Sequence, residues 1–414
     1  MQSHTPAQRI TTIDALRGFA LLGILFAHFI FWHSGGPLPQ SFYDPSKYGI
    51  ASAVVFFINN IFIFGKFYTF FAFLFGLSFY LQMKSRQKKG ENFTLRYCWR
   101  LLILLAIGLL HHSFWMGDIL SIYAVLGFAL LPMRKWSDKA LLVTGILLVL
   151  NVPGRIWEII NLLFIHYQQP DDGGKFANDY LSVIRQGNWR QIIALNWRGM
   201  ENKFYFQVFS GRLIITLGFF VLGMYTGRKK WFENEETSKP IFKKVYRNSG
   251  FTLIGTIVIA LLIVGANFAL KLNLEKSEAA GLVFGMLFDI NSAAMVLFYI
   301  SGLTMLMYRR RWRNSLHRLA PVGKMALTSY LLQTLFGLLL FYHVGLGLSH
   351  FTTPGWNWII AIFIYALQVI LSTWWFRYFT YGPVEWIWRS GTMMKWQPFV
   401  KNTTIINTNP VVTA

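Results

Sequence analysis

The chain has 414 residues, of which 54% are hydrophobic and 18% aromatic, while only 14% are charged. Soluble domains usually carry about 25% charged residues, so this composition excludes an ordinary soluble domain. The formal net charge of +22 could indicate a nucleic-acid binder. The basic residues, however, stand in short blocks between long apolar runs, a pattern that orients membrane helices, and we therefore expect no nucleic-acid partner.

The apolar runs are continuous rather than alternating, which indicates helices and not a barrel. A membrane span needs about 20 mostly apolar residues. The sequence therefore predicts an all-α, polytopic transmembrane bundle of about ten spans. In chain order these are residues 13–33, 66–83, 98–114, 117–133, 139–160, 205–227, 249–271, 280–307, 323–345 and 356–379. The single cysteine, Cys98, excludes an internal disulfide and a cysteine metal cluster.

The stretch 49–64 is short and carries Asn59 and Asn60 in its middle. It is either an eleventh span or a helix that lies on the outer surface of the membrane. Ten spans place most Lys and Arg residues on the side of both chain ends, and the positive-inside rule then favours the interfacial interpretation. We expect a multi-pass protein of the cell inner membrane with both ends in the cytoplasm.

The expected organisation is one transmembrane domain over 1–399, followed by a polar, disordered tail over 400–414. A long polar segment, 161–204, is expected to form an extracytoplasmic cap. Two helix-like stretches lie in it, 177–186 and 188–198, with a Gly187-Asn188 turn between them.

Polar groups inside a span are costly and are therefore functional candidates. The first span carries Asp14, Arg17 and His28. The eleven residues from Arg17 to His28 correspond to about three helical turns and about 16 Å, so both side chains face one way. Arg17 is then a candidate anion clamp and His28 a candidate general base. The alternative is structural: Asp14 and Arg17 pair at three residues' separation, and His28 bonds a carbonyl.

His111, His112 and Asp118 stand around the predicted outer turn between 98–114 and 117–133. An imidazole with an orienting carboxylate can act as a base. Adjacent histidines diverge on a helix, so we expect no metal there. The structural alternative for Asp118 is the N-cap of the next helix.

Four further polar residues are weaker candidates. Lys66 could snorkel toward an anionic head group. Asp289 interrupts a span and should face inward, with Arg212 as its expected partner. Glu385 follows the last span, and its expected partner is Arg389 at i+4.

The sequence resembles the YeiB family of uncharacterised bacterial inner-membrane proteins. The matching stretches are IDALRGFALLGILFAHF at 13–29, GKFYTFFAFLFGLSFYLQ at 65–82, GDILSIYAVLG at 117–127, PVGKMALTSYLLQT at 321–334 and YGPVEWIWRSGT at 381–392. They extend over nearly the whole chain, and the last two are the most specific.

That family is distantly similar to the transmembrane acyltransferases, which include O-acetyltransferases of surface glycans and heparan-α-glucosaminide N-acetyltransferase. The O-acetyltransferases carry an arginine, ten residues and a histidine in their first helix, and Arg17 and His28 reproduce this spacing. The resemblance implies an acyl-CoA donor at Arg17 and catalysis by His28. From its position, Lys66 is a second candidate for contact with that donor. Members of the family can carry asparagine at the His28 position, which leaves His111 as the next candidate.

The predicted function is thus transfer of an acyl group from cytoplasmic acyl-CoA to an extracytoplasmic glycan or lipid. A transporter of a small solute or lipid, and an integral membrane protein without turnover, stay open as alternatives. Membrane lipids are expected partners, and a homodimer stays open.

Overall fold

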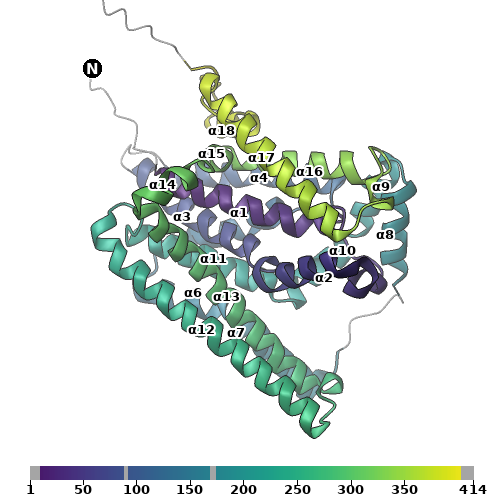
Figure 1. The fold of residues 1–414 in the computed structure, drawn as a ribbon. Coiled ribbons are helices and arrows are strands. Elements are labelled where there is room, and N and C mark those ends of the chain that lie inside the picture. The colour runs from purple at the N-terminus through teal and green to yellow at the C-terminus, as the bar shows by residue number, and fades with distance from the viewer. Residues whose placement is uncertain (1–9, 88–91, 168–173, 402–414) are drawn as a thin grey trace, which may run out of the picture.

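The structure, a computed structural model, describes residues 10–87, 92–167 and 174–401. Within these ranges the regular structure is helical throughout, apart from one isolated bridge between Phe379 and Val400 (Figure 1). The all-α prediction is confirmed. The predicted tail over 400–414 lies outside the described residues except for its first two.

Six helical segments are long and apolar enough to cross a membrane, and eight if each of two bent pairs counts as one span. The six lie in α1 (Thr11–Phe29), the stretch Pro45–Gln87 that ends with α3 (Phe67–Gln87), α4 (Phe93–Phe114), α12 (Glu235–Leu270), α13 (Glu278–Tyr308) and α17 (Pro354–Tyr378). Two shorter apolar helices are α5 (Leu120–Met133) and α16 (Ala326–Phe341). The chain is therefore a helical membrane protein, while ten spans, their orientation and the inner membrane stay predictions.

The predicted spans 139–160 and 205–227 are not straight. The first divides into α6 (Asp138–Val149) and α7 (Val152–Ile160), bent by 49°, and the second comprises α10 (Met200–Phe209) and α11 (Arg212–Arg228), bent by 64°. Asn151 and Gly211 break the helices, because both adopt left-handed backbone with φ of 54° and 70°. The two breaks touch: a Cβ on Gly211 would lie 2.2 Å from Asn151 Nδ2.

Helix α1 lies inside the bundle, packed against α3, α16, α17 and the short α15 (Ala320–Lys324). Its approach to α15 is very close, because a Cβ on Gly323 would lie 1.8 Å from the carbonyl oxygen of Asp14. This contact brings Lys324 next to the start of α1. Helices α3 and α11 approach in the same way, since a Cβ on Gly223 would lie 2.0 Å from the Phe73 carbonyl oxygen.

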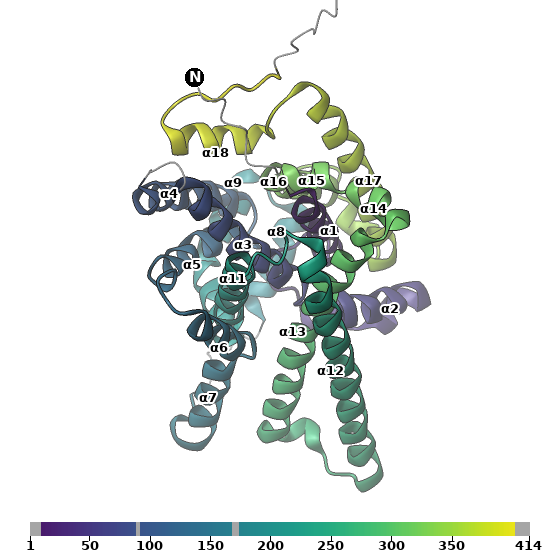
Figure 2. The same cartoon turned by 90° about the vertical axis from the view of Figure 1, so that its left-hand side faces the viewer.

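Helices α12 and α13 form a long antiparallel arm that projects from the bundle (Figure 2). The predicted spans 249–271 and 280–307 are only parts of these helices. Helix α12 begins earlier because Asn234 caps it through the Thr237 amide and two acidic residues occupy its first turn. The outer faces of the arm expose apolar side chains such as Leu262 and Phe268, 68% and 88% exposed, which suit contact with lipid.

The stretch 49–64 forms α2 (Gly49–Ile58) and a π-helical turn, Asn59–Ile63. Helix α2 contacts α17, and the Gly355 amide donates to the Ser52 hydroxyl over 3.3 Å. Ile50 and Phe57 are 86% and 61% exposed. An apolar exposed face fits both a span and an interfacial helix, so both interpretations stay open.

The remaining helices and turns are short. Helices α8 (Lys175–Gln186) and α9 (Trp189–Arg198) each carry an arginine in the last turn, Arg185 and Arg198. Gly187 and Asn188 separate the two helices, and Asn188 forms a capping box with Gln191. These helices stand at the end opposite α14 (Arg310–His317) (Figure 1). The others are α18 (Pro383–Met393), the 3-10 turns Gln40–Tyr43, Pro45–Tyr48, Leu274–Lys276 and Leu348–His350, and the π turn Asn161–Ile165.

Candidate functional site

A cavity of about 260 Å³ lies between α1, α3, α4, α5, α16 and α18. One end is basic, with Arg17, Arg100, Lys324 and Arg389 in its lining, and we call these four residues the basic mouth. The mouth belongs to the end of the bundle that is predicted to be cytoplasmic. The wall beyond it is largely apolar, so the cavity combines a positively charged entrance with an apolar interior.

The basic mouth is held in place by specific contacts. Arg17 donates to the Asp14 carboxylate over 2.7 Å and to the Ser78 hydroxyl over 2.6 Å. The Arg100 guanidinium lies 3.4 Å above the Trp388 ring, and Lys324 lies 4.0 Å above the Phe376 ring. Cations ordered in this way lose less entropy when they bind an anion.

The cavity follows one face of α1. Arg17, Leu21 and Ile24 line it, and they stand at the i, i+4 and i+7 positions of the face on which His28 is the i+11 residue. Arg17 lines the cavity and His28 does not, so the expected common face of the two side chains stays a prediction. The predicted pairing of Asp14 with Arg17 is also present.

Tyr330 of α16 closes the far end of the cavity. Its ring centre lies 5.2 Å from that of His111 and 6.3 Å from that of His28. His28 in turn packs edge-on against Trp115, with 4.5 Å between ring centres. The Nδ1 atom of His28 is buried and has no hydrogen-bond partner within the described part of the chain. The two candidate bases thus lie on the far side of one tyrosine from the cavity.

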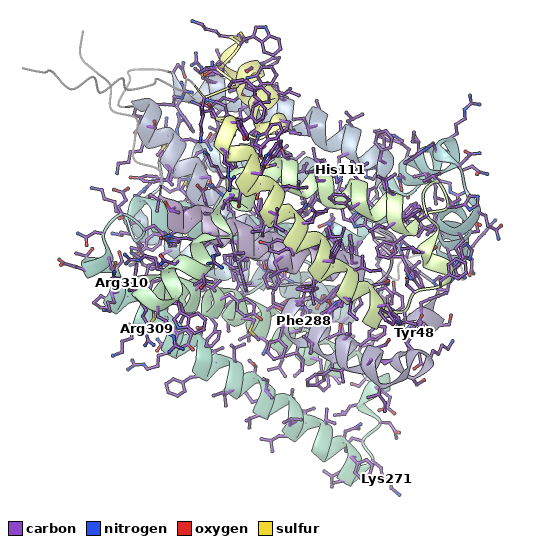
Figure 3. All side chains as sticks on the ribbon, turned by 45° about the horizontal axis from the view of Figure 1, so that its top comes forward. Tyr48, His111, Lys271, Phe288, Arg309 and Arg310 are labelled. Atoms are coloured by element: carbon purple, nitrogen blue, oxygen red, sulfur yellow. The ribbon has the colours of Figure 1, made fainter. Side chains whose placement is uncertain are left out.

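His111 is the centre of a hydrogen-bonded row. Its Nδ1 lies 2.8 Å from Asp118 Oδ1, and its Nε2 lies 2.9 Å from the hydroxyl of Thr334. Asp118 also accepts from the amides of Leu120 and Ser121, so its carboxylate contacts both the imidazole and the start of α5. Its role as an orienting acid stays a prediction. Figure 3 shows His111 within the bundle, far from Arg309 and Arg310 at the α14 end.

His112 points away from this row. Its Nε2 lies 3.0 Å from the Asn196 carbonyl oxygen, and its Nδ1 lies 3.2 Å from Lys203 Nζ. An imidazole that donates to a carbonyl through Nε2 accepts from the ammonium through Nδ1. Lys203, 8% exposed, also lies 3.7 Å from Asp118 Oδ2, so α10 supplies a buried positive charge beside the acid.

The expected pair of Arg212 and Asp289 is wrong. Asp289 instead binds Arg155 of α7 over 2.5 Å and the Asn151 amide group over 3.2 Å. The Arg212 guanidinium lies 4.0 Å above the ring of Tyr68. Arg155 follows the bend between α6 and α7, and α7 contacts α13.

Lys66 and Glu385 also take other partners than expected. Lys66 is 1% exposed and donates to the Asn60 carbonyl oxygen over 3.0 Å, so it does not snorkel. It does not line the cavity either.

Glu385 lines the basic mouth but does not pair with Arg389 along its own helix. It accepts from the amides of Leu327 and Thr328, over 2.7 and 3.1 Å, and from the Thr328 hydroxyl. It therefore caps the first turn of α16 from a different helix. Burial raises the pKa of Glu385, although the hydrogen bonds from Thr328 oppose that rise.

No cluster of three or more His, Cys, Asp or Glu side chains that could hold a metal ion exists in the described ranges. The expectation of no metal stays a prediction. Sequence reasoning missed Thr334, Lys203 and Tyr330. Thr334 and Tyr330 stand in the hydroxyl-rich start of the predicted span 323–345, a composition that is typical of helix packing. No local signal links these two residues to His111.

Comparisons with known proteins find similar chains of unknown function. A family model described as "Protein of unknown function (DUF418)" matches residues 226–395. The chain is similar over 98% of its length to the "Uncharacterized protein YxaH" of Bacillus subtilis, at 28% identity over 99% of that protein. It is similar over 96% of its length to the "Uncharacterized protein YeiB" of Escherichia coli, at 26% identity over 99% of that protein. No solved structure matches the chain.

Proposed function

This chain is a member of the YeiB-like family of membrane proteins, and from that premise we propose that it is an acyltransferase-like enzyme of the cell inner membrane. It takes an acyl group from cytoplasmic acyl-CoA and passes it to a hydroxyl of a glycan or lipid on the outer side. The proposal depends on one observation: a single cavity connects a basic mouth to a tyrosine whose ring lies against those of two histidines, His28 and His111.

The basic mouth suits the phosphates of coenzyme A. Guanidinium groups match phosphate geometry with paired donors, and Arg17, Arg100 and Arg389 converge on the entrance beside Lys324. The apolar wall beyond them suits an acyl chain. The volume of about 260 Å³ is near the lower end of ligand pockets, about 300 Å³, so it favours a short acyl group over a long one.

The far end of the cavity suits proton transfer. His111 lies against Tyr330 and is oriented by Asp118, which is the arrangement that a general base requires. Asp118 receives its own stabilising contacts from backbone amides. His111 is therefore the preferred base of this proposal, and His28, whose nearest ring neighbour is Trp115, shapes the site beside it.

A transporter is the second candidate, because broken spans that meet inside the membrane are typical of carriers. The touching bends at Asn151 and Gly211 favour it. An oriented imidazole beside a hydroxyl is not needed for transport, and this is why we place the enzyme first.

The test uses the full chain in proteoliposomes with [14C]acetyl-CoA on the side of the basic mouth and envelope glycolipid extract on the other. We expect label in the extract, and a loss of about 100-fold with His111→Ala. Binding of coenzyme A should weaken in Lys324→Ala and Arg389→Gln. Passage of intact label without chemical change would support the transporter instead, and absence of coenzyme A binding would overturn the acyl-CoA proposal.

A further inference from the structure

The hydroxyl of Thr334 has an unusual partner for a threonine inside an apolar helix. Such hydroxyls commonly donate to the carbonyl one turn earlier, and Ser301 and Thr304 do so over 2.6 Å each. Thr334 instead lies 2.9 Å from Nε2 of His111, on a helix 223 residues away in sequence. The side chain is buried at 3% exposure, so solvent does not compete for this contact.

The proton positions follow from Asp118. Its carboxylate accepts from the Leu120 amide, the Ser121 amide and the Ser121 hydroxyl, over 3.1, 3.0 and 2.5 Å. Asp118 has these three donors and also the Lys203 ammonium 3.7 Å from Oδ2, and this nearby positive charge keeps it ionised. The Nδ1 atom of His111 therefore carries the proton that it donates to Asp118. In the neutral imidazole the Nε2 atom is then an acceptor, and the Thr334 hydroxyl donates to it.

Thr334, His111 and Asp118 therefore form a hydroxyl, a base and an orienting acid in one row. This is the arrangement that activates serine and threonine nucleophiles. Lys203 Nζ lies 3.7 Å from Asp118 on the side away from the cavity, and it adds positive charge that helps to keep the acid ionised.

The row lies directly behind the end of the cavity. Ile119 and Leu120, which follow Asp118, line the cavity, and so does Tyr330. Tyr330 precedes Thr334 by four residues on α16, which is about one helical turn or 6 Å along the axis. A thioester carried along the apolar wall is thereby delivered to the Tyr330 ring, with the threonine one turn beyond.

From this geometry we infer that Thr334 is the nucleophile of a two-step transfer and carries the acyl group as an ester. The inference rests on the proposed function and specifies its chemistry. In the first step Thr334 Oγ1 attacks the thioester carbonyl, and its proton passes to His111 Nε2. The carbon–sulfur bond breaks, and the leaving thiolate of coenzyme A takes that proton as a thiol.

In the second step an acceptor hydroxyl attacks the threonine ester and gives its proton to His111 Nε2. The ester bond to Thr334 breaks, and the Thr334 alkoxide takes the proton back from His111. No oxidant, reductant or further reactant is required. An ester held on the protein also allows the donor to leave through the basic mouth before the acceptor arrives.

The experiment is a single-turnover reaction of the full chain in nanodiscs with [14C]acetyl-CoA and no acceptor. Released thiol is measured, and the protein is digested and sequenced by mass spectrometry. We expect one acetyl group on Thr334, with about one thiol released per chain. Thr334→Val should abolish both, Thr334→Ser should retain both with the acetyl on the serine, and His111→Ala should slow them by about 100-fold.

The matched control is Thr304→Val, which removes a hydroxyl that is also buried but bonds only its own helix. It should label like the unaltered chain. Each variant is first shown to bind coenzyme A as the parent does, which separates lost chemistry from lost folding.

An acetyl group on another residue, or Thr334→Val that still transfers label to the envelope extract at the parent's rate, would overturn the inference and leave the acyltransferase proposal standing. Failure of the parent chain to bind acetyl-CoA or to transfer its label at all would overturn both.

Discussion

Arg155 and Asp289 form an ion pair over 2.5 Å between α7 and α13, with side chains that are 13% and 4% exposed. Removal of one partner leaves the other charge buried without compensation, which costs about 3 kcal/mol. We expect Asp289→Asn and Arg155→Gln each to lower the free energy of unfolding in mixed micelles. The double variant should lose less than the sum, with a coupling energy of at least about 1 kcal/mol.

Arg212 provides the control for that cycle, because it stands over Tyr68 rather than beside Asp289. Arg212→Gln combined with Asp289→Asn should be additive within about 0.5 kcal/mol. Strong coupling between these two residues, and none with Arg155, would contradict the described pairing.

Leu104 lines the cavity from α4 and is 2% exposed. An indole at this position occupies space that the acyl chain needs, while the basic mouth is unchanged. We expect Leu104→Trp to weaken binding of butyryl-CoA at least about tenfold and to leave binding of coenzyme A itself within about twofold, since one buried methylene is worth about 0.8 kcal/mol. Isothermal titration in nanodiscs measures both.

The matched control is Leu102→Trp on the same helix, where the side chain is 47% exposed. It should bind both ligands as the parent does. Equal loss of butyryl-CoA binding in both tryptophan variants would mean that the cavity is not the acyl site.

Glu385 gives a prediction for pH. Burial raises its pKa above the ordinary 4.5, so the folded chain holds the proton to higher pH than the unfolded chain does. The stabilising contribution of this group is present at low pH and is lost as pH rises through the folded-state value. Melting temperature should therefore fall with pH above about 4.5 in the parent and fall less in Glu385→Gln.

Glu385→Ala, in contrast, removes the cap of α16 altogether and should cost about 1 kcal/mol at every pH. Melting curves of the parent and both variants, recorded in one detergent across the range, separate the two effects. A glutamine variant with the same pH profile as the parent would contradict the ionisation argument.

Gly223 makes the close contact of α11 with α3 possible, because a Cβ there would lie 2.0 Å from a backbone oxygen. Backbone cannot yield as a flexible side chain does, so Gly223→Ala should force the helices apart and lower stability by about 1–3 kcal/mol. Gly255→Ala in α12 has open space around the new methyl group and should stabilise the helix slightly, by about 0.5–1 kcal/mol. Thermal unfolding in detergent checks the opposite signs.

Local sequence patterns predicted what local spacing controls. The apolar runs predicted the helices, the three-residue spacing predicted the pair of Asp14 and Arg17, and the predicted turn after 98–114 placed His111 near Asp118. Contacts set by tertiary packing could not be read in this way. Thr334 meets His111 across 223 residues, and Asp289 meets Arg155 across 134.

For both wrong pairings the observed contacts join different helices, and local spacing does not determine such contacts. The Arg212 and Asp289 pair was inferred from opposite charge alone, but Asp289 contacts Asn151 and Arg155, which stand at the bend between α6 and α7. Glu385 was assigned to Arg389 by helical spacing, but the unpaired amides at the start of α16 provide three donors to it.

The meeting of the two bends at Asn151 and Gly211 has a mechanical meaning. Because the Gly211 backbone occupies the space beside the Asn151 amide, neither kink can straighten without pushing the other. The helices on either side of the two bends are thereby coupled. Asp289 of α13 contacts both Asn151 and Arg155, and it joins the long α12–α13 arm to these helices. A rocking movement of that arm would therefore act on α11 and, through the Gly223 contact, on α3, which lines the cavity.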